Sequence, residues 1–158
     1  MPSDVEQVHL GEHGTLQAAN QPEILIDFTT SSPGMAERLA EQAAAQGAMA
    51  LDAPVSGGDV GAREGRLSIM VGGPEAAFRS AQPLFEHLGT TIVHHGDPGA
   101  GQRAKLINQI LVAGGMLGLA EAMAFCEQSG LDHDLVLQSV SAGAAGSWAV
   151  DHLAPRVA

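Results

Sequence analysis

Lys105 is the residue of this sequence best suited to acid–base chemistry. It is the only lysine among 158 residues, and no charged residue follows it before Glu121. Asn108 and Gln109 come three and four residues later, so on a helix the three side chains share one face. A cation beside amide donors and acceptors suits a substrate with a carboxylate and a hydroxyl or carbonyl oxygen. From spacing alone, the alternative is an ordinary solvated residue of a first helical turn.

Ser56, Gly57 and Gly58 form a second group of interest, because they follow an apolar run typical of a buried strand. Open parallel sheets bind ligands beyond the carboxyl ends of their strands. Successive glycines let backbone N–H groups approach an anion closely, and the serine hydroxyl adds a donor. A carboxylate site and a simple tight turn are the two interpretations. Thr29 and Thr30 occupy the corresponding place after the preceding strand, where helix capping is the alternative to ligand binding.

Two other patterns imitate known ligand sites. His9 and His13 have the spacing of a helical metal-binding pair, but Gly11 lies between them and no third ligand is evident. We therefore expect no metal site. Residues 99–104 fit the G-x-G-x-x-A pattern of a dinucleotide-binding loop. A long helical pattern follows them instead of a second parallel strand, so we interpret the two glycines as a hinge.

The elements that must position these residues are of two kinds. Before about residue 99, short apolar runs alternate with helical patterns, as in α/β folds. A helix that starts near Pro33 separates the first two strands, which are therefore expected to be parallel. We expect a loop through Gly61 and Gly65, and a helix from Pro74 that Pro83 breaks. Strand patterns cover residues 24–28, 48–51, 67–71 and 91–94.

Beyond residue 99 only helical patterns remain, so we place a domain boundary there. One long helix is predicted from Ala104 to about Ser129, and another begins at Asp132. Because the long helix is apolar nearly all round, we expect a larger helical body or a second subunit to cover it. The chain is therefore predicted to be a homo-oligomer.

Composition argues against several classes of partner. Seven basic against eighteen acidic residues give a net charge of −11, which repels nucleic acids and anionic lipids. The uncharged stretch 106–120 is shorter than the roughly 20 residues of a membrane span. We therefore expect neither a nucleic-acid nor a membrane partner. The single cysteine, Cys126, and the absence of an apolar signal pattern favour a cytoplasmic protein.

Four segments, in this order, resemble the β-hydroxyacid dehydrogenase family, which includes 3-hydroxyisobutyrate dehydrogenase, tartronate semialdehyde reductase and glyoxylate reductase. They are DFTTSSP at 27–33, DAPVSGG at 52–58, GRLSIMVGG at 65–73 and GAGQRAKLINQ at 99–109. The resemblance implies an α/β fold: residues 1–99 would be the C-terminal half of a Rossmann-like domain. Residues 100–158 would be the long interdomain helix and the start of an all-α domain. It also implies truncation at both ends, because the family's N-terminal G-x-G-x-x-G loop and its later helices are not matched.

The same resemblance implies an oxidoreductase that uses NADP or NAD and acts on a small carboxylate substrate. By motif, the implied roles are catalytic acid and base for Lys105, carboxylate binding for Ser56, Gly57 and Gly58, substrate orientation for Asn108 or Gln109, and nicotinamide contact for Thr29 and Thr30.

Two hypotheses from different classes follow. In the first, the chain belongs to an enzyme that moves hydride between the cofactor and a small β-hydroxyacid or its semialdehyde. In the second, it is a catalytically inactive, truncated family member that serves as an oligomeric structural or interaction module. The missing pyrophosphate loop favours the second hypothesis, and the intact set of Lys105 with Ser56 favours the first.

Overall fold

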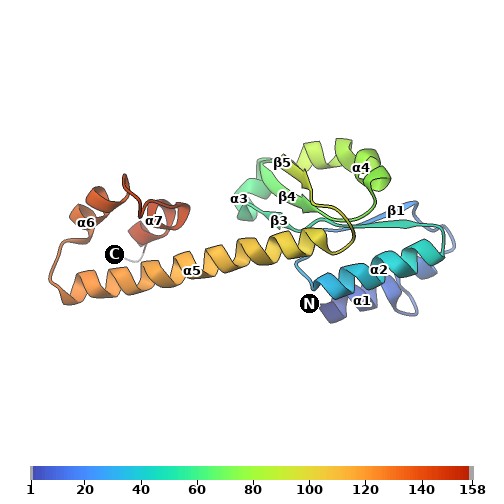
Figure 1. The fold of residues 1–158 in the computed structure, drawn as a ribbon, viewed down its shortest axis with the longest axis horizontal. Helices are drawn as coiled ribbons and strands as arrows, with labels where there is room; N and C mark the ends of the chain where they lie inside the picture. The colour runs from blue at the N-terminus through green and yellow to red at the C-terminus, as the bar shows by residue number, and fades with distance from the viewer. Residues whose placement is uncertain (1, 157–158) are drawn as a thin grey trace. The chain divides into compact units, whose positions relative to one another are not determined.

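The computed structural model describes residues 2–156 and shows a mixed α/β chain (Figure 1). The chain divides into two compact units, Met1–Ile107 and Asn108–Ala158. Within the described residues, all strands belong to the first unit. Helix α5 (Ala100–Gln128) starts directly after residue 99, where alternating strand and helix patterns give way to helical patterns alone. It continues through the division between the units.

The first two strands form a parallel pair, as the sequence predicted. Strand β1 (Ile24–Asp27) pairs with β2 (Met49–Asp52) along the whole length of both. Helix α2 (Pro33–Ala45) connects them. The Ser32 hydroxyl begins this helix by accepting a 3.2 Å hydrogen bond from the Met35 N–H.

A second sheet contains the remaining strands, β3 (Val55–Ser56), β4 (Leu67–Val71) and β5 (Gly89–His94). Strand β3 is antiparallel to β4, and β4 is parallel to β5. An antiparallel bridge between Asp52 and Gly72 joins the end of β2 to the end of β4. The segment from β2 to β3 thus passes from one sheet to the other just before the Ser56 region.

Residues expected to form a loop instead form the short helix α3 (Gly58–Arg63). Its ends are tied by an ion pair between Asp59 and Arg63, one helical turn apart, at 2.5 Å. The helix ends before Gly65, whose φ of +63° is a left-handed conformation. The expectation of a loop through Gly61 was therefore wrong. Gly61 and Gly65 are typical of loops, but the Asp59–Arg63 ion pair favours a helical turn.

The expectation that Pro83 breaks the fourth helix was also wrong, since α4 runs unbroken over Glu75–Leu88. A proline inside a helix removes one hydrogen bond and costs about 3 kcal/mol. Burial of the helix face offsets that cost, because fully burying one large apolar side chain contributes about 1.5–3 kcal/mol. The buried residues of this face are Ala77, Ala81 and Phe85.

Helices cover both faces of the strands in the first unit (Figure 1). Helix α2 and the preceding α1 (Pro2–Leu10) pack on one face, together with the turn η1 (Thr15–Gln17). Helix α4 packs on the other. The two resulting cores are built mainly from aliphatic side chains, which include Val5, Leu16, Leu25 and Leu39 in one and Leu51, Ile69 and Val71 in the other. The second core also contains the aromatic ring of Phe85.

The second unit contains only helices within its described residues. Gly130, with a φ of +68°, follows the end of α5, and the Asp132 carboxylate accepts a 3.0 Å hydrogen bond from the Leu135 N–H to begin α6 (His133–Val140). Helix α7 (Trp148–His152) and the turn η2 (Ala154–Arg156) come last. A small core joins these elements through Leu119, Met123, Leu137 and Ala154.

Helix α5 extends beyond both ends of the uncharged stretch 106–120. It has 29 residues, and one window of 18 has a mean hydropathy of 1.6 with only 17% of its residues buried. By length and composition alone it could cross a membrane, although core helices of globular proteins pass the same test. The expected absence of a membrane partner therefore stays a prediction.

Candidate active site

Lys105 lies in the first turns of α5 with its side chain buried at 8% exposure. Its Nζ atom donates a 2.8 Å hydrogen bond to the carbonyl oxygen of Val55. Burial lowers the pKa of Lys105 below its ordinary value of 10.5. Among the described residues no carboxylate forms an ion pair with it. The amine is therefore largely shielded from solvent and held by a neutral carbonyl, and it is not the solvated surface charge that spacing alone allowed.

The contact to Val55 brings the amine to the start of the predicted carboxylate site, because this carbonyl belongs to the peptide bond that leads into Ser56. Gly57 and Gly58 follow with φ of +132° and +63°. Within the described residues, neither of their N–H groups is bonded to a backbone carbonyl, and the Ser56 hydroxyl makes no hydrogen bond. The Lys105 amine thus contacts the residue that precedes three unused donors, those of Ser56, Gly57 and Gly58. A cation beside several hydrogen-bond donors suits an oxyanion.

Asp52, at the end of β2, holds the beginning of α5 in place. Its carboxylate oxygens accept 2.8 Å hydrogen bonds from the N–H groups of Gly99 and Gln102. Burial raises the pKa of Asp52, and these two hydrogen bonds oppose that rise. An aspartate from a different segment therefore caps the helix that bears Lys105.

The same contacts bear on the dinucleotide-like pattern at 99–104. A pyrophosphate would need free N–H groups at this helix start, but Asp52 already accepts from two of them. The helix also packs tightly there: a Cβ added to Gly101 would lie 2.4 Å from the Met70 carbonyl oxygen and 2.6 Å from that of Asp52. These contacts support the rejection of this segment as a pyrophosphate loop.

Gln102 is the residue of this region that sequence reasoning missed. It is fully buried, its Nε2 donates to the Thr29 carbonyl oxygen at 2.8 Å, and its Oε1 accepts from the Ser31 N–H at 2.9 Å. The Thr29 N–H in turn donates to the Asp27 carboxylate at 2.9 Å. The only signal for Gln102 in the sequence was a long amide side chain at the start of an otherwise apolar helix.

The loop predicted to contact the nicotinamide therefore has a fixed backbone. The Thr29 and Thr30 side chains are exposed, and no hydrogen bond fixes either hydroxyl within the described chain. Asn108 and Gln109 belong to the second unit, where the Asn108 Nδ2 donates to the Gln109 Oε1 at 2.9 Å. The predicted roles of these four residues stay predictions.

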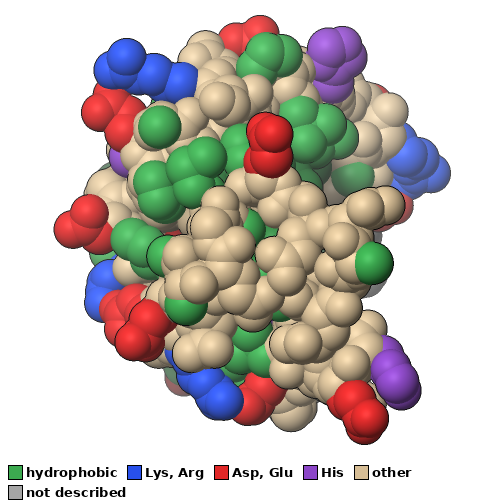
Figure 2. Space-filling model, turned by 90° about the vertical axis from the view of Figure 1, so that its right-hand side faces the viewer, with side chains coloured by type: hydrophobic (Ala, Val, Ile, Leu, Met, Phe, Trp, Pro, Cys, Tyr) green, Lys and Arg blue, Asp and Glu red, His purple; other side chains and the backbone are tan. Residues whose placement is uncertain are grey.

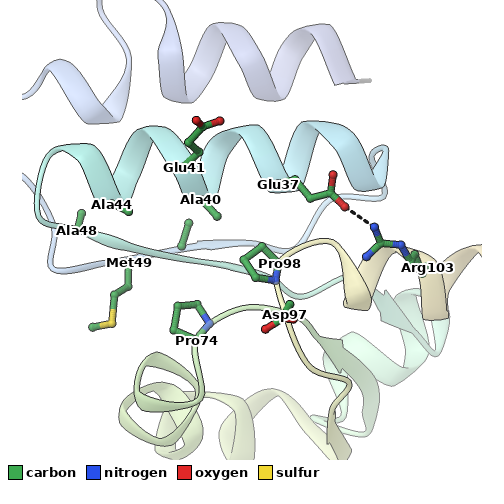
Figure 3. A pocket seen from close by; sticks show the side chains of 11 residues that line it. Glu37, Ala40, Glu41, Ala44, Ala48, Met49, Pro74, Asp97, Pro98 and Arg103 are labelled. Carbon is green, nitrogen blue, oxygen red and sulfur yellow. Dashed lines mark hydrogen bonds and ion pairs between the residues drawn. The ribbon is translucent and has the colours of Figure 1, made fainter.

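One hollow of the first unit is lined by none of the predicted residues. It measures about 610 Å³ and lies between α2, the start of β2 and the segment 97–103 (Figure 3). Met49, Pro74 and Pro98 contribute apolar walls, and the ion pair between Glu37 and Arg103 bounds it. None of the residues that carry the candidate chemistry lines this hollow.

Charge and metal ligands add no competing site. Acidic side chains are spread over the face shown in Figure 2, in keeping with the net charge of −11. No group of three or more His, Cys, Asp or Glu residues in the described part of the chain could hold a metal ion. Cys126 is buried in α5.

Parallel strand pairs covered by helices, followed by a long helix that carries a buried lysine, place the chain in the Rossmann-like class of α/β proteins. Two family models match the chain. Residues 1–96 match the NAD binding domain of 6-phosphogluconate dehydrogenase, and residues 99–158 match the NAD-binding domain of NADP-dependent 3-hydroxyisobutyrate dehydrogenase. The chain belongs to the β-hydroxyacid dehydrogenase family.

Individual relatives agree with this assignment. An uncharacterized oxidoreductase of Bacillus subtilis (YkwC) is 50% identical over 99% of this chain and 54% of its own length. The 2-hydroxy-3-oxopropionate reductase of Escherichia coli is 45% identical over 90% of this chain and 49% of its own length. A solved structure of Psf3 in complex with NADP+ and 2-OPP superimposes with a TM-score of 0.91 at 28% identity, covering 99% of this chain and 56% of that one.

The chain therefore spans about half the length of the relatives that it matches. Its residues fit one end of a dinucleotide better than the other. The Thr29 and Thr30 side chains are exposed just after the end of β1, and the Gln102 bond to the Thr29 carbonyl holds this loop against the helix that bears Lys105, so their hydroxyls are free to contact a nicotinamide. By contrast, the G-x-G-x-x-A segment has the N–H groups of Gly99 and Gln102 bonded to Asp52 and that of Ala100 bonded to the Asp97 carbonyl, so it does not fit a pyrophosphate.

Proposed function

We propose that this chain supplies the substrate-binding and proton-transfer residues of an NAD(P)-dependent dehydrogenase. The substrate would be a small β-hydroxyacid or its semialdehyde. One observation carries the proposal: the buried Lys105 amine is hydrogen-bonded to the Val55 carbonyl, at the entrance to the unused donors of Ser56, Gly57 and Gly58. The family models and the reductase from Escherichia coli support this substrate class.

Substrate binding would use the donors along 56–58. A carboxylate can accept hydrogen bonds from the Ser56 hydroxyl and from the free N–H groups of Gly57 and Gly58. The positive φ of both glycines favours residues without a Cβ at these two positions. With its carboxylate held there, a short substrate places its reacting oxygen toward Lys105.

Lys105 would transfer the proton. An ammonium group has three N–H donors, and the bond to the Val55 carbonyl uses one of them. A second can donate to the substrate carbonyl oxygen and pass its proton to it during reduction; the neutral amine accepts the same proton during oxidation. The lowered pKa of Lys105 brings the acid closer to neutral pH, where such a transfer is most effective.

When bound beside Thr29 and Thr30, NADPH or NADH would supply the hydride to the carbonyl carbon. In sum, the semialdehyde, the reduced cofactor and one proton give the hydroxyacid and the oxidised cofactor. In this proposal the described residues would hold the nicotinamide end only, and tight cofactor binding would require pyrophosphate donors other than those at 99–104. The comparisons give no support to the alternative of an inactive structural module.

The decisive experiment uses the fact that Lys105 is the only lysine. In a full chain with isotope-labelled lysine, the side-chain NMR spectrum contains a single amine-bearing residue. Adding 3-hydroxyisobutyrate should shift this signal, whereas isobutyrate, which lacks the hydroxyl, should shift it much less. In parallel, NADPH- or NADH-dependent reduction of 2-hydroxy-3-oxopropionate at millimolar cofactor should fall at least about 100-fold in Lys105→Ala. Turnover that is indifferent to this substitution contradicts the proposal.

We also propose that the protein acts in the cytoplasm as a homo-oligomer. The proposal rests on α5, whose exposed apolar residues in the second unit include Ile110, Leu111 and Leu117 at 63–71% exposure. The start of the same helix is buried in the first unit through Gln102 and Lys105. A second copy therefore suits its apolar face better than a lipid bilayer does, and liposome flotation tests the bilayer directly.

A further inference from the structure

We propose that Gln102 is a positioning residue, which sets the Lys105 amine relative to the Thr29 loop. The inference rests on the proposed function and adds a residue to it. Gln102 is fully buried, and in the described chain its side chain forms no hydrogen bond with the Lys105 amine. Its influence must therefore pass through the backbone that it binds.

The side-chain amide of Gln102 connects two distant segments. It bonds the Thr29 carbonyl oxygen and the Ser31 N–H, 73 and 71 residues away, at 2.8 and 2.9 Å. Both halves of the amide are thus satisfied by one loop, one as donor and one as acceptor. An apolar residue of the same length would remove the partner of both loop groups, which are partly shielded from solvent.

The backbone of Gln102 is fixed from the opposite direction. Its N–H donates to the Asp52 carboxylate at 2.8 Å, and Asp52 leads directly into the segment that contains Val55. Lys105 follows Gln102 by three residues, or about one helical turn with a rise of about 1.5 Å per residue. One residue therefore joins the Thr29 loop, the strand leading to Val55 and the helix that bears the amine.

This junction has a mechanistic consequence. During reduction, the carbonyl carbon must face the nicotinamide beside the Thr29 loop while its oxygen faces Lys105. The relative placement of these two partners decides whether hydride and proton reach adjacent atoms. Gln102 sets that placement, so its loss should move the amine even when the chain stays folded.

The test reads Lys105 directly and needs neither cofactor nor turnover. In Gln102→Met, of similar length but without hydrogen-bonding groups, the labelled lysine should show a changed signal and a pKa closer to the ordinary lysine value. Affinity for 3-hydroxyisobutyrate should fall at least fivefold. Gln102→Asn, which is neutral but one methylene too short to bond both loop groups, should lie between this variant and the parent. Leu16→Val is the matched control, because Leu16 is equally buried but lies in the core against α1 and α2.

The outcomes separate this inference from the proposed function. A folded Gln102→Met chain with the parent's lysine signal, pKa and affinity would overturn the positioning role, whatever Lys105→Ala does to turnover. A change of similar size in Leu16→Val would also overturn it, since general destabilisation would then suffice. If Gln102→Met does not fold, hydrogen exchange in the parent decides: the Ser31 amide should be strongly protected, and exchange at the rate of an open loop would contradict the proposal.

Discussion

The amine of Lys105 lies 2.8 Å from the carbonyl oxygen of Val55, fifty residues earlier in the chain. This contact gives a buried cation one fixed neutral partner and leaves two of its N–H groups available. An ion pair with a carboxylate would have favoured the charged amine and raised its pKa. The pairing with Val55 instead leaves burial as the dominant influence on the pKa, which is lowered. A lowered pKa suits the proposed proton transfer, whereas burial of the amine lowers the stability of its charged form.

Replacing Lys105 by Met should therefore stabilise the chain at neutral pH while it abolishes proton transfer. Below the lowered pKa, the folded chain bears a buried charge that the unfolded chain hydrates freely. Between this pKa and the ordinary value of 10.5, the unfolded state holds more protons, so the free energy of unfolding of the parent rises with pH. The advantage of Lys105→Met should shrink over the same range.

Urea unfolding at neutral pH and again near pH 10.5 measures this effect. Arg63→Met is the control, because Arg63 is exposed and its substitution should show no such dependence on pH. A Lys105→Met chain that is less stable than the parent at neutral pH would show that the bond to Val55 outweighs the burial of charge.

Two adjacent serines should respond to alanine with opposite signs. The Ser31 hydroxyl is buried and has no hydrogen-bond partner in the described chain, so Ser31→Ala should raise the free energy of unfolding by about 1 kcal/mol. The Ser32 hydroxyl caps α2 through the Met35 N–H, so Ser32→Ala should lower it by about 1 kcal/mol. Thermal unfolding of the two variants checks the pair. Equal losses would mean that Ser31 also has a partner, for example a bound water.

Local sequence patterns predicted the secondary structure well where a single segment decides it. The parallel pair around α2 was predictable because strand patterns and helical periodicity act over a few residues. Pro83 misled the prediction of α4, since the outcome depends on how much apolar surface the sheet buries beneath Phe85. No local pattern reports that burial.

The candidate site was predictable in part for the same reason. Residues after parallel strands gather at one sheet edge, so topology brought the Ser56 region into consideration, and the lone Lys105 stood out by type. The roles of Asp52 and Gln102 escaped, because both act through contacts between segments 47–73 residues apart. A buried carboxylate that caps another segment's helix leaves no periodic trace in the sequence.

Close packing at the start of α5 predicts that Gly101→Ala is strongly destabilising. The new Cβ would lie 2.4 Å from the Met70 carbonyl oxygen and 2.6 Å from that of Asp52, and backbone atoms cannot easily retreat. We expect a loss of at least about 2 kcal/mol in the free energy of unfolding. Gly34→Ala in α2 is the matched control, since its Cβ would meet nothing within 4 Å and should be neutral or stabilising. Similar effects of the two substitutions in denaturant unfolding would contradict the packing argument.

Occupation of the α5 start by Asp52 predicts weak cofactor binding by this chain. Isothermal titration with NADPH and with NADH should show weak binding or none, because the G-x-G-x-x-A segment has no free N–H pair for a pyrophosphate. Micromolar affinity for either dinucleotide would require another phosphate site. Asp52→Ala serves as the comparison: it frees the two N–H groups but should also loosen the helix that carries Lys105.

The apolar face of α5 predicts a dimer or a larger assembly. Substituting a glycine of this helix tests it, because the change should stabilise a monomer but weaken an assembly. A Cβ added to Gly118 meets nothing within 4 Å in a single chain, so in a monomer Gly118→Ala should stabilise the helix by about 1 kcal/mol. In an assembly that packs a second backbone against this glycine, the same change should weaken association. Light scattering at micromolar concentration should give more than one chain mass for the parent.

A charge placed on this face should disperse the assembly. Leu117→Glu is expected to give a monomer, because Leu117 is 63% exposed in a single chain and a buried, unpaired carboxylate is costly at an interface. Leu84→Glu is the matched control: Leu84 is 49% exposed on α4 and should leave the mass unchanged. The prediction that a second copy packs on α5 would be contradicted by a parent that is monomeric at micromolar concentration, together with a Gly118→Ala variant that is more stable than the parent.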